Sequence, residues 1–288
     1  MSEKRVKTEI KKKKKRLAVY IVASVLSFVL ATLGILQLGC VYTANTWEAY
    51  RPDYAKTDIS VILEKEKLTE ADYALLYRQT GLTKLGVDGY LAKGDKRGIL
   101  DTQEFFFEDH EVIARCFNIF TYDEKIRANA PIAPVETGDI LVTSTTRVSW
   151  WRYGHAALVI NGEKGLLLES IAPGTKSKMN YVSDFSDLAN FIVLRPKVDK
   201  ETKEAVAEYA IKNLCDLPYA MTRGVLSKKY PETLKNTQCA HLVWYAYKKF
   251  GIDLDYNGGG IVKPQDMALS QHVEVVQAYG FDLDRLWS

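Results

Sequence analysis

The sequence has few residues that bind metals or form disulfides, with four cysteines and four histidines among 288 residues. Cys40, Cys116, Cys215 and Cys239 include no close pair and have no metal-ligand spacing with any histidine. We therefore expect no structural zinc site. The spacing does not demand a disulfide either, although a bond between Cys116 and Cys215 stays open as an alternative.

A glycine-rich phosphate loop is also lacking. Gly258, Gly259 and Gly260 lie in a late loop with no expected strand before them and no Lys-Ser or Lys-Thr after them. We expect no cofactor. The sequence has no internal repeat, and its low-complexity stretch is a basic segment at the N-terminus.

The positive charge is confined to that basic segment. Residues 1–16 contain nine Lys or Arg against two Glu, a net charge of +7, whereas the whole chain carries +3. The remaining residues are therefore net negative. Nucleic-acid binding by the globular part is not expected, because it would require a basic surface.

An uncharged, apolar run follows the basic tail. Residues 17–39 are rich in Leu, Val, Ile and Ala, and as a helix they would span a hydrocarbon core of about 30 Å. The run is too long for a cleaved signal peptide. We expect an uncleaved transmembrane anchor with residues 1–16 in the cytoplasm, since basic residues favour that side, and with the rest of the chain outside.

The end of this run allows a second interpretation. Leu38, Gly39 and Cys40 partly resemble the lipid-attachment signal of bacterial lipoproteins, in which the cysteine becomes acylated. Gln37 stands where that signal prefers leucine. Lipidation of Cys40 is therefore left open beside the anchor.

Residues 41–130 read as a helical juxtamembrane segment. Thr69 and Asp72 form a capping box that begins one helix, and a second helix is expected from Thr102 to about Tyr122. His110 is interpreted as a solvated helix residue rather than a catalyst. Whether this segment covers an active site as a lid is left open.

A separate domain is expected over residues 131–288, because prolines 131 and 134 break the helical pattern. Residues 139–143 predict a strand, residues 156–160 and 166–168 a hairpin around Asn161 and Gly162, and residues 191–194 another strand. A helix is expected from about Lys200 to Asn213. The fold class is therefore α+β with an antiparallel sheet.

The most informative stretch runs from Asn236 to Gly251. Apolar residues recur at helical spacing, and Cys239 falls in the first turn. Unpaired backbone N–H groups and the helix dipole favour a thiolate there, and a thiolate is the nucleophilic form of cysteine. The alternative is a small buried residue that fills a gap in the core.

Two further residues complete a catalytic pattern. If the hairpin turns near Gly162, His155 and Glu169 lie directly opposite each other on one face. Glu169 could then orient the imidazole of His155, which would accept a proton from the thiol of Cys239. The pairing depends on the register of the hairpin.

Several motifs together resemble those of the circularly permuted NlpC/P60 enzymes, the YiiX-like branch of the papain-like fold. The resemblance covers about residues 131–270, and its elements follow the order of that family, with the histidine before the cysteine. The motifs are Thr-Gly-Asp-Ile-Leu (137–141), Tyr-Gly-His-Ala-Ala-Leu-Val-Ile (153–160), Leu-Glu-Ser (168–170), Leu-Pro-Tyr (217–219), Gln-Cys-Ala-His-Leu-Val-Trp (238–244) and Gly-Ile-Asp-Leu (251–254).

The resemblance implies a permuted papain-like domain in which Cys239 is the nucleophile, His155 the base and Glu169 the orienting residue. It also implies that Tyr219 lines the substrate site. Ala240 and His241 depart from the family pattern, which often has serine and then an acidic residue, so the substrate preference stays open. His241 points about 200° away from the cysteine around the helix and is not expected to be the base.

These observations favour a membrane-anchored, outward-facing cysteine hydrolase that cleaves amide bonds, with cell-wall peptides as the substrates implied by the family. One alternative keeps the nucleophile and acts on lipid acyl groups as a thioesterase or acyltransferase. Another is a non-catalytic surface module that binds without reacting. The expected partners are a peptide, cell-wall or lipid acyl substrate and the membrane, but not nucleic acid.

Overall fold

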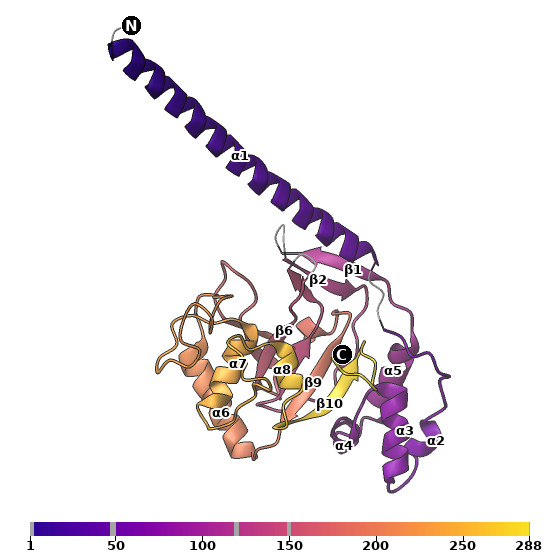
Figure 1. Ribbon diagram of the computed structural model, residues 1–288. Coiled ribbons are helices and arrows are strands. Elements are labelled where there is room, and N and C mark those ends of the chain that lie inside the picture. The colour runs from indigo at the N-terminus through magenta and orange to yellow at the C-terminus, as the bar shows by residue number, and fades with distance from the viewer. Residues whose placement is uncertain (1–2, 47–49, 118–120, 149–150, 288) are drawn as a thin grey trace.

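The computed structural model describes residues 3–46, 50–117, 121–148 and 151–287 (Figure 1). For residues 3–8, 40, 41 and 43–46 it describes the backbone alone. The question of a lipid on Cys40 therefore lies outside the described side chains.

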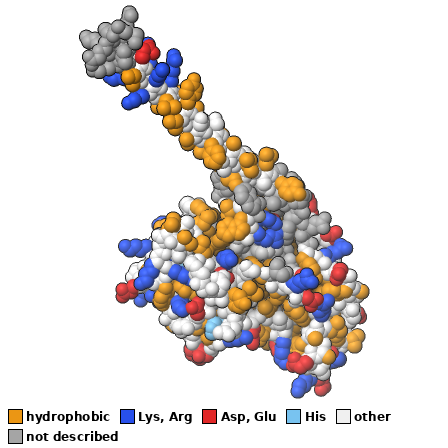
Figure 2. All heavy atoms as spheres, viewed as in Figure 1, with side chains coloured by type: hydrophobic (Ala, Val, Ile, Leu, Met, Phe, Trp, Pro, Cys, Tyr) orange, Lys and Arg blue, Asp and Glu red, His pale blue; other side chains and the backbone are white. Residues whose placement is uncertain are grey.

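The first element is a long helix, α1 (Glu3–Thr46), which extends away from the rest of the protein (Figure 1). Its segment Glu9–Gly39 is long and apolar enough to cross a membrane and is not buried against the rest of the described protein. Figure 2 shows Lys and Arg side chains near its start and apolar side chains farther along. Such a helix is compatible with a single-pass membrane anchor.

Four short helices follow: α2 (Ser60–Leu63), α3 (Glu70–Thr80), α4 (Lys84–Ala92) and α5 (Lys96–Phe107). The expected capping box begins α3. Thr69 Oγ1 accepts a hydrogen bond from Asp72 N at 3.2 Å, and Asp72 Oδ2 accepts one from Thr69 N at 2.9 Å. The helix ends at Gly81, whose φ of 70° satisfies the left-handed C-cap without strain.

The expected helix from residue 102 to about 122 is wrong. Helix α5 ends at Phe107, and two antiparallel strands follow, β1 (Val112–Cys116) and β2 (Thr121–Ile126). The β-branched residues of these strands fit a pleated surface better than a helix. His110 comes after the helix and stacks on Phe105 with ring centroids 4.1 Å apart, so it is half-buried and not a solvated helix residue.

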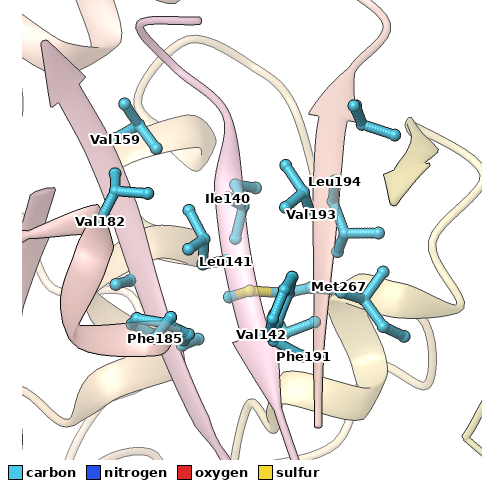
Figure 3. Close-up of a cluster of buried hydrophobic side chains, with 14 of the residues drawn as sticks. Ile140, Leu141, Val142, Val159, Val182, Phe185, Phe191, Val193, Leu194 and Met267 are labelled. Carbon is cyan, nitrogen blue, oxygen red and sulfur yellow. The ribbon is translucent and has the colours of Figure 1, made fainter. Parts of the chain in front are cut away.

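A six-stranded antiparallel sheet forms the centre of the protein, in the order β10-β9-β3-β6-β7-β8. Its strands appear close to the positions expected from sequence. In chain order they are β3 (Ile140–Thr143), β6 (His155–Asn161), β7 (Leu166–Glu169), β8 (Lys178–Tyr181), β9 (Phe191–Pro196) and β10 (Val273–Tyr279). Figure 3 shows buried apolar side chains between these strands and the elements beside them.

The helices of the C-terminal half are α6 (Lys200–Leu214), α7 (Cys239–Lys248) and α8 (Pro264–Ala268), with a 3₁₀ turn, η1 (Val182–Phe185). Both α6 and α7 pack on β6 and on each other. Helix α7 is buried almost throughout. Its position against β6 brings the start of α7 toward the strand that begins with His155.

A second, four-stranded sheet has the order β1-β2-β4-β5, in which β4 is Thr146–Val148 and β5 is Trp151–Arg152. In the chain, β1 and β2 come before β3, and β4 and β5 come between β3 and β6. Two backbone hydrogen bonds tie β2 to the segment before β9: Ile126 N donates to Asp187 O at 2.8 Å, and Ala189 N donates to Glu124 O at 3.0 Å. The small sheet therefore lies against the end of the large sheet where β6 begins.

The helices before residue 110 occupy a different place. Thr83 N donates to Val276 O at 3.0 Å, and Ala278 N donates to Gly81 O at 2.9 Å, so α3 and α4 dock along β10. Strand β10 is the edge of the large sheet remote from β7 and β8. Of the segment considered as a lid, β2 lies near His155, whereas α3–α5 pack at the opposite edge.

Candidate active site

The nucleophile candidate is the first residue of α7. Gln238 is the N-cap, and its Oε1 accepts hydrogen bonds from Ala240 N at 3.0 Å and from Cys239 Sγ at 3.3 Å. Its Nε2 donates to Val262 O at 2.7 Å, which holds the cap in place. The thiol of Cys239 thus lies at the positive end of the helix dipole and is only 1% exposed.

The register of the β6–β7 hairpin differs from the expected one. Ala157, not His155, is opposite Glu169, and the pairing shifts between Val159 and Asn161 because of a bulge. The connection is also longer than a two-residue turn, since β6 ends at Asn161 and β7 begins at Leu166. The direct pairing of His155 with Glu169 is therefore wrong by two residues.

The two side chains nevertheless meet. A displacement of two residues keeps both on the same face, because side chains alternate with a period of two. His155 Nε2 lies 2.5 Å from Glu169 Oε2, and Asn180 on the neighbouring strand β8 donates a hydrogen bond to Glu169 Oε1. His155 and Glu169 are both buried, at 8% and 5% exposure. The carboxylate is thus held from both sides.

Electrostatics couple these residues to the cysteine. Burial alone would lower the pKa of His155, but hydrogen bonds with Cys239 and Glu169 and the charges of both raise it well above its ordinary value. Burial would raise the pKa of Glu169, but the hydrogen bond and charge of His155, helped by Asn180 and Lys178, hold it below its ordinary value. The pair therefore favours an imidazolium beside a carboxylate.

Two tyrosines lie within electrostatic range of Cys239. Burial and the charge of Cys239 raise the pKa of both Tyr153 and Tyr219 far above the ordinary value, so both hydroxyls stay protonated. Tyr153 is 7% exposed, and its hydroxyl has no hydrogen-bond partner among the described residues. An unpartnered buried donor close to the nucleophile is available to a substrate oxygen.

His241 is occupied elsewhere. Its Nδ1 lies 3.0 Å from Thr237 Oγ1, and its Nε2 lies 2.8 Å from Lys229 O. Burial lowers its pKa to about 4, and the charges of Arg223 and Lys229 act in the same direction against the hydrogen bond to the carbonyl. His241 is therefore neutral near pH 7 and hydrogen-bonded away from Cys239.

Within the described part of the chain, no group of three or more His, Cys, Asp or Glu residues is arranged to hold a metal ion. Cys116, Cys215 and Cys239 are free thiols, so the disulfide left open between Cys116 and Cys215 does not form. The reactive side chains of the site are a thiol, Cys239, an imidazole, His155, and a carboxylate, Glu169.

Sequence reasoning missed four residues of this region: Tyr153, Gln238, Asn180 and Asp123. Tyr153 and Gln238 each lie beside or near a residue that was singled out, so proximity along the chain could have flagged them. Asn180 lies on a strand that the sequence did not predict, and Asp123 directly follows the wrongly expected helix, on a strand that was not predicted either. Asn180 and Asp123 come close to His155 and Glu169 through the pairing of strands and not through the local sequence.

Comparison with known proteins adds little to this geometry. No family model matches the sequence, and no solved structure matches it. A protein of Bacillus subtilis (strain 168) named "Uncharacterized protein YycO" is 28% identical over 141 residues, which is 48% of this chain and 54% of that protein. The chain thus matches about half the length of this curated relative, whose name states no activity.

Proposed function

We propose that the protein is a membrane-anchored cysteine hydrolase that cleaves amide bonds on the outer side of the membrane. The observation that carries the proposal is the pairing of His155 on β6 with Glu169 on β7, together with the electrostatic coupling of His155 to Cys239 at the start of α7. The three residues are a nucleophile, a base and an orienting group in the order that thiol catalysis needs. The permuted papain-like resemblance supports the same roles.

In this proposal His155 uses Nε2 for Glu169, which leaves Nδ1 for the thiol. The thiolate of Cys239 attacks the carbonyl carbon, a carbon–sulfur bond forms, and the oxyanion accepts hydrogen bonds from the Cys239 N–H and the Tyr153 hydroxyl. The carbon–nitrogen bond then breaks as His155 gives its proton to the departing nitrogen. Water attacks the acyl-enzyme, returns a proton to His155 and releases the thiolate.

The charge distribution at the anchor supports the location that we propose. The basic residues among positions 4–16 come before the apolar run 17–39, and such residues favour the cytoplasmic side, so the catalytic residues would lie outside. Amide bonds of peptides in the cell wall are the substrates that suit an enzyme held at that surface. Protease accessibility of the C-terminal region in intact cells, compared with lysed cells, tests this orientation, and protection in intact cells would contradict it.

The decisive experiment compares full-length wild type with Cys239→Ala and Cys239→Ser in detergent micelles. Release of new amino groups from cell-wall peptides, followed by mass spectrometry, is expected for wild type and absent for both variants, while circular dichroism remains unchanged. An active Cys239→Ala protein would end the proposal. Acyl transfer from phospholipid vesicles, with no peptide cleavage, would instead favour a lipid-directed enzyme that uses the same cysteine.

A further inference from the structure

Several strand ends of the small sheet lie together at one side of it. Cys116, the last residue of β1, pairs with Tyr122 near the start of β2. Val148, the last residue of β4, pairs both with Thr121 at the start of β2 and with Trp151 at the start of β5. We call this side the turn end of the small sheet and define it by the described residues Arg115, Cys116, Phe117, Trp151 and Arg152.

Two large aromatic side chains at the turn end are open to solvent. Phe117 is 45% exposed and Trp151 is 49% exposed. The backbone at this place is held in the fold, because Phe117 N donates to Thr121 O at 2.8 Å. Exposed Phe and Trp side chains that gather at one place are typical of a surface that meets an apolar phase.

The small sheet also carries positive charge. Its four strands contain four basic and two acidic residues, a net charge of +2, whereas the chain beyond residue 16 is net negative as a whole. Arg115 is exposed next to Cys116, and the side chain of Arg152 is 30% exposed. Arginines near a bilayer are attracted to anionic lipid headgroups. The turn end therefore combines aromatic rings with basic charge.

The apolar helix α1 meets the rest of the protein beside this sheet. Figure 1 shows β1 and β2 next to the end of α1. Arg51 follows that end by five residues, and its Nη1 lies 3.4 Å from Oδ2 of Asp109, shortly before β1. Figure 2 shows basic and apolar side chains together where the helix meets the rest of the protein. An anchor formed by α1 therefore holds the small sheet close to the membrane surface.

Both exposed aromatic residues also contact the catalytic region. Trp151 packs edge-on against Tyr153, with ring centroids 5.4 Å apart. Phe117 lines a cavity of about 140 Å³ whose lining also includes His155 and Glu169. A partner bound at the turn end is consequently next to the proposed catalytic residues.

We propose that the turn end of the small sheet docks on the surface of the bilayer that α1 spans. The rings of Phe117 and Trp151 lie at the level of the headgroups, where aromatic side chains are favoured, and the arginines face anionic lipid. Docking fixes the orientation of the domain relative to its anchor and keeps the catalytic residues near the membrane surface. The proposal goes beyond the hydrolase function and does not depend on it.

The test uses the exposed thiol of Cys116 as the attachment point for the fluorophore NBD. The other cysteines are removed as Cys40→Ser, Cys215→Ser and Cys239→Ala, and the full-length protein is placed in nanodiscs that contain phosphatidylglycerol. One preparation includes a lipid with a nitroxide on its headgroup, and a parallel one is titrated with iodide in the water. We expect the nitroxide to quench about half or more of the emission, because the probe lies at the interface.

The control probe is attached at Val61→Cys in the same protein with Cys116→Ser added. Val61 is 70% exposed on α2, and Figure 1 shows α2 well away from the small sheet. The nitroxide lipid should leave this probe nearly unquenched, and iodide should quench it more strongly than it quenches the probe at Cys116.

A second comparison separates docking from tethering by α1 alone. Phe117→Ser combined with Trp151→Ser leaves α1 and the probe at Cys116 in place, and we expect quenching by the nitroxide lipid to fall about 5-fold or more. Circular dichroism shows whether this variant is folded. Nanodiscs of phosphatidylcholine alone should also lower the quenching with both aromatic residues intact, because the arginines lose their anionic partners.

Equal quenching of the Cys116 and Val61 probes by the nitroxide lipid would overturn the proposal, and so would undiminished quenching in the folded double variant. Protection from iodide without quenching by the lipid would assign the turn end to another protein or a second copy, and the proposal would be wrong. Failure of the labelled protein to enter nanodiscs would show that α1 is no anchor, and docking would fail with it.

Discussion

Glu169 and His155 are not paired across the β6–β7 ladder, yet Glu169 Oε2 lies 2.5 Å from His155 Nε2. The diagonal arrangement is possible because a shift of two residues keeps both side chains on one face and a long side chain can span the offset. Asn180 fixes the other carboxylate oxygen. The orientation of the imidazole is therefore determined by three strands, β6, β7 and β8.

The first prediction concerns this carboxylate. Glu169→Gln keeps the shape of the side chain but removes the charge that stabilises the imidazolium of His155. We expect the rate of Cys239 alkylation near pH 7 to fall about 10- to 100-fold, the equivalent of one buried charge-assisted hydrogen bond. Asn180→Ala should give a smaller decrease in the same direction. An unchanged rate in Glu169→Gln would show that the carboxylate does not orient the base.

The second prediction concerns the pH dependence of stability. The pKa of His155 is raised in the folded state, so its contribution is complete below the ordinary value of 6.5 and is lost as the pH rises through the folded pKa. The pKa of Glu169 is lowered, so its contribution is complete above 4.5 and is lost as the pH falls through the folded pKa. The pair stabilises the protein most between these two values.

Urea unfolding of wild type and His155→Gln at a series of pH values measures this effect. The difference in free energy of unfolding should be largest between pH 4.5 and 6.5 and should shrink toward alkaline pH. A difference that grows above pH 6.5 would mean that His155 is neutral in the folded protein.

How much of the site was predictable depends on the range of the interactions involved. The β-strand and helix at His155 and Cys239 follow from local patterns of apolar residues, and these elements appear where expected. The position of Glu169 in the β6–β7 ladder could not be predicted from local sequence. It depends on a bulge and a longer connection, which are determined by packing and not by neighbouring residues. The helix expected up to about residue 122 was wrong because the apolar residues there fit both the helical period of 3.6 residues and the strand period of two.

That last error concealed the small sheet, and with it Asp123. Residues 121–126 have no local feature that places them beside His155, which lies about thirty residues later. Their position depends on pairing with β4 and on the bonds of β2 to Asp187 and Ala189. Tertiary pairing of this kind has no signature in a single sequence.

The third prediction concerns the stability of that small sheet. The carboxylate of Glu124 is almost fully buried and binds two arginines, Arg147 and Arg152, the latter at 2.9 Å. Glu124→Gln removes the buried negative charge that faces both arginines, and we expect a loss of about 3 to 5 kcal/mol in the free energy of unfolding. Urea titration followed by circular dichroism measures it.

The control for Glu124 is a carboxylate of the same region in an exposed ion pair. Glu111 lies 3.4 Å from Arg127, and both side chains are about two-thirds exposed. Glu111→Gln should cost less than about 1 kcal/mol, because water screens such pairs. Equal losses in the two variants would show that the buried arginines find other partners when Glu124 is neutralised.

The last prediction separates a catalytic hydroxyl from a structural one. Tyr153 and Tyr247 are both buried, but the Tyr153 hydroxyl has no partner among the described residues, whereas the Tyr247 hydroxyl donates to Gly138 O. Tyr153→Phe removes an unpaired polar group, so the free energy of unfolding should stay the same or rise by about 1 kcal/mol. If this hydroxyl donates to the oxyanion, kcat/KM should fall about 10²-fold.

Tyr247→Phe should show the opposite combination. Gly138 O loses its donor in a buried place, so we expect a loss of about 1 to 3 kcal/mol in stability with kcat/KM nearly unchanged where both proteins are folded. Unfolding by urea and turnover of the same peptide substrate give both quantities for each variant. A Tyr153→Phe protein that is less stable but fully active would show that the Tyr153 hydroxyl stabilises the fold and has no role in catalysis. The oxyanion would then be stabilised by backbone N–H donors at the start of α7.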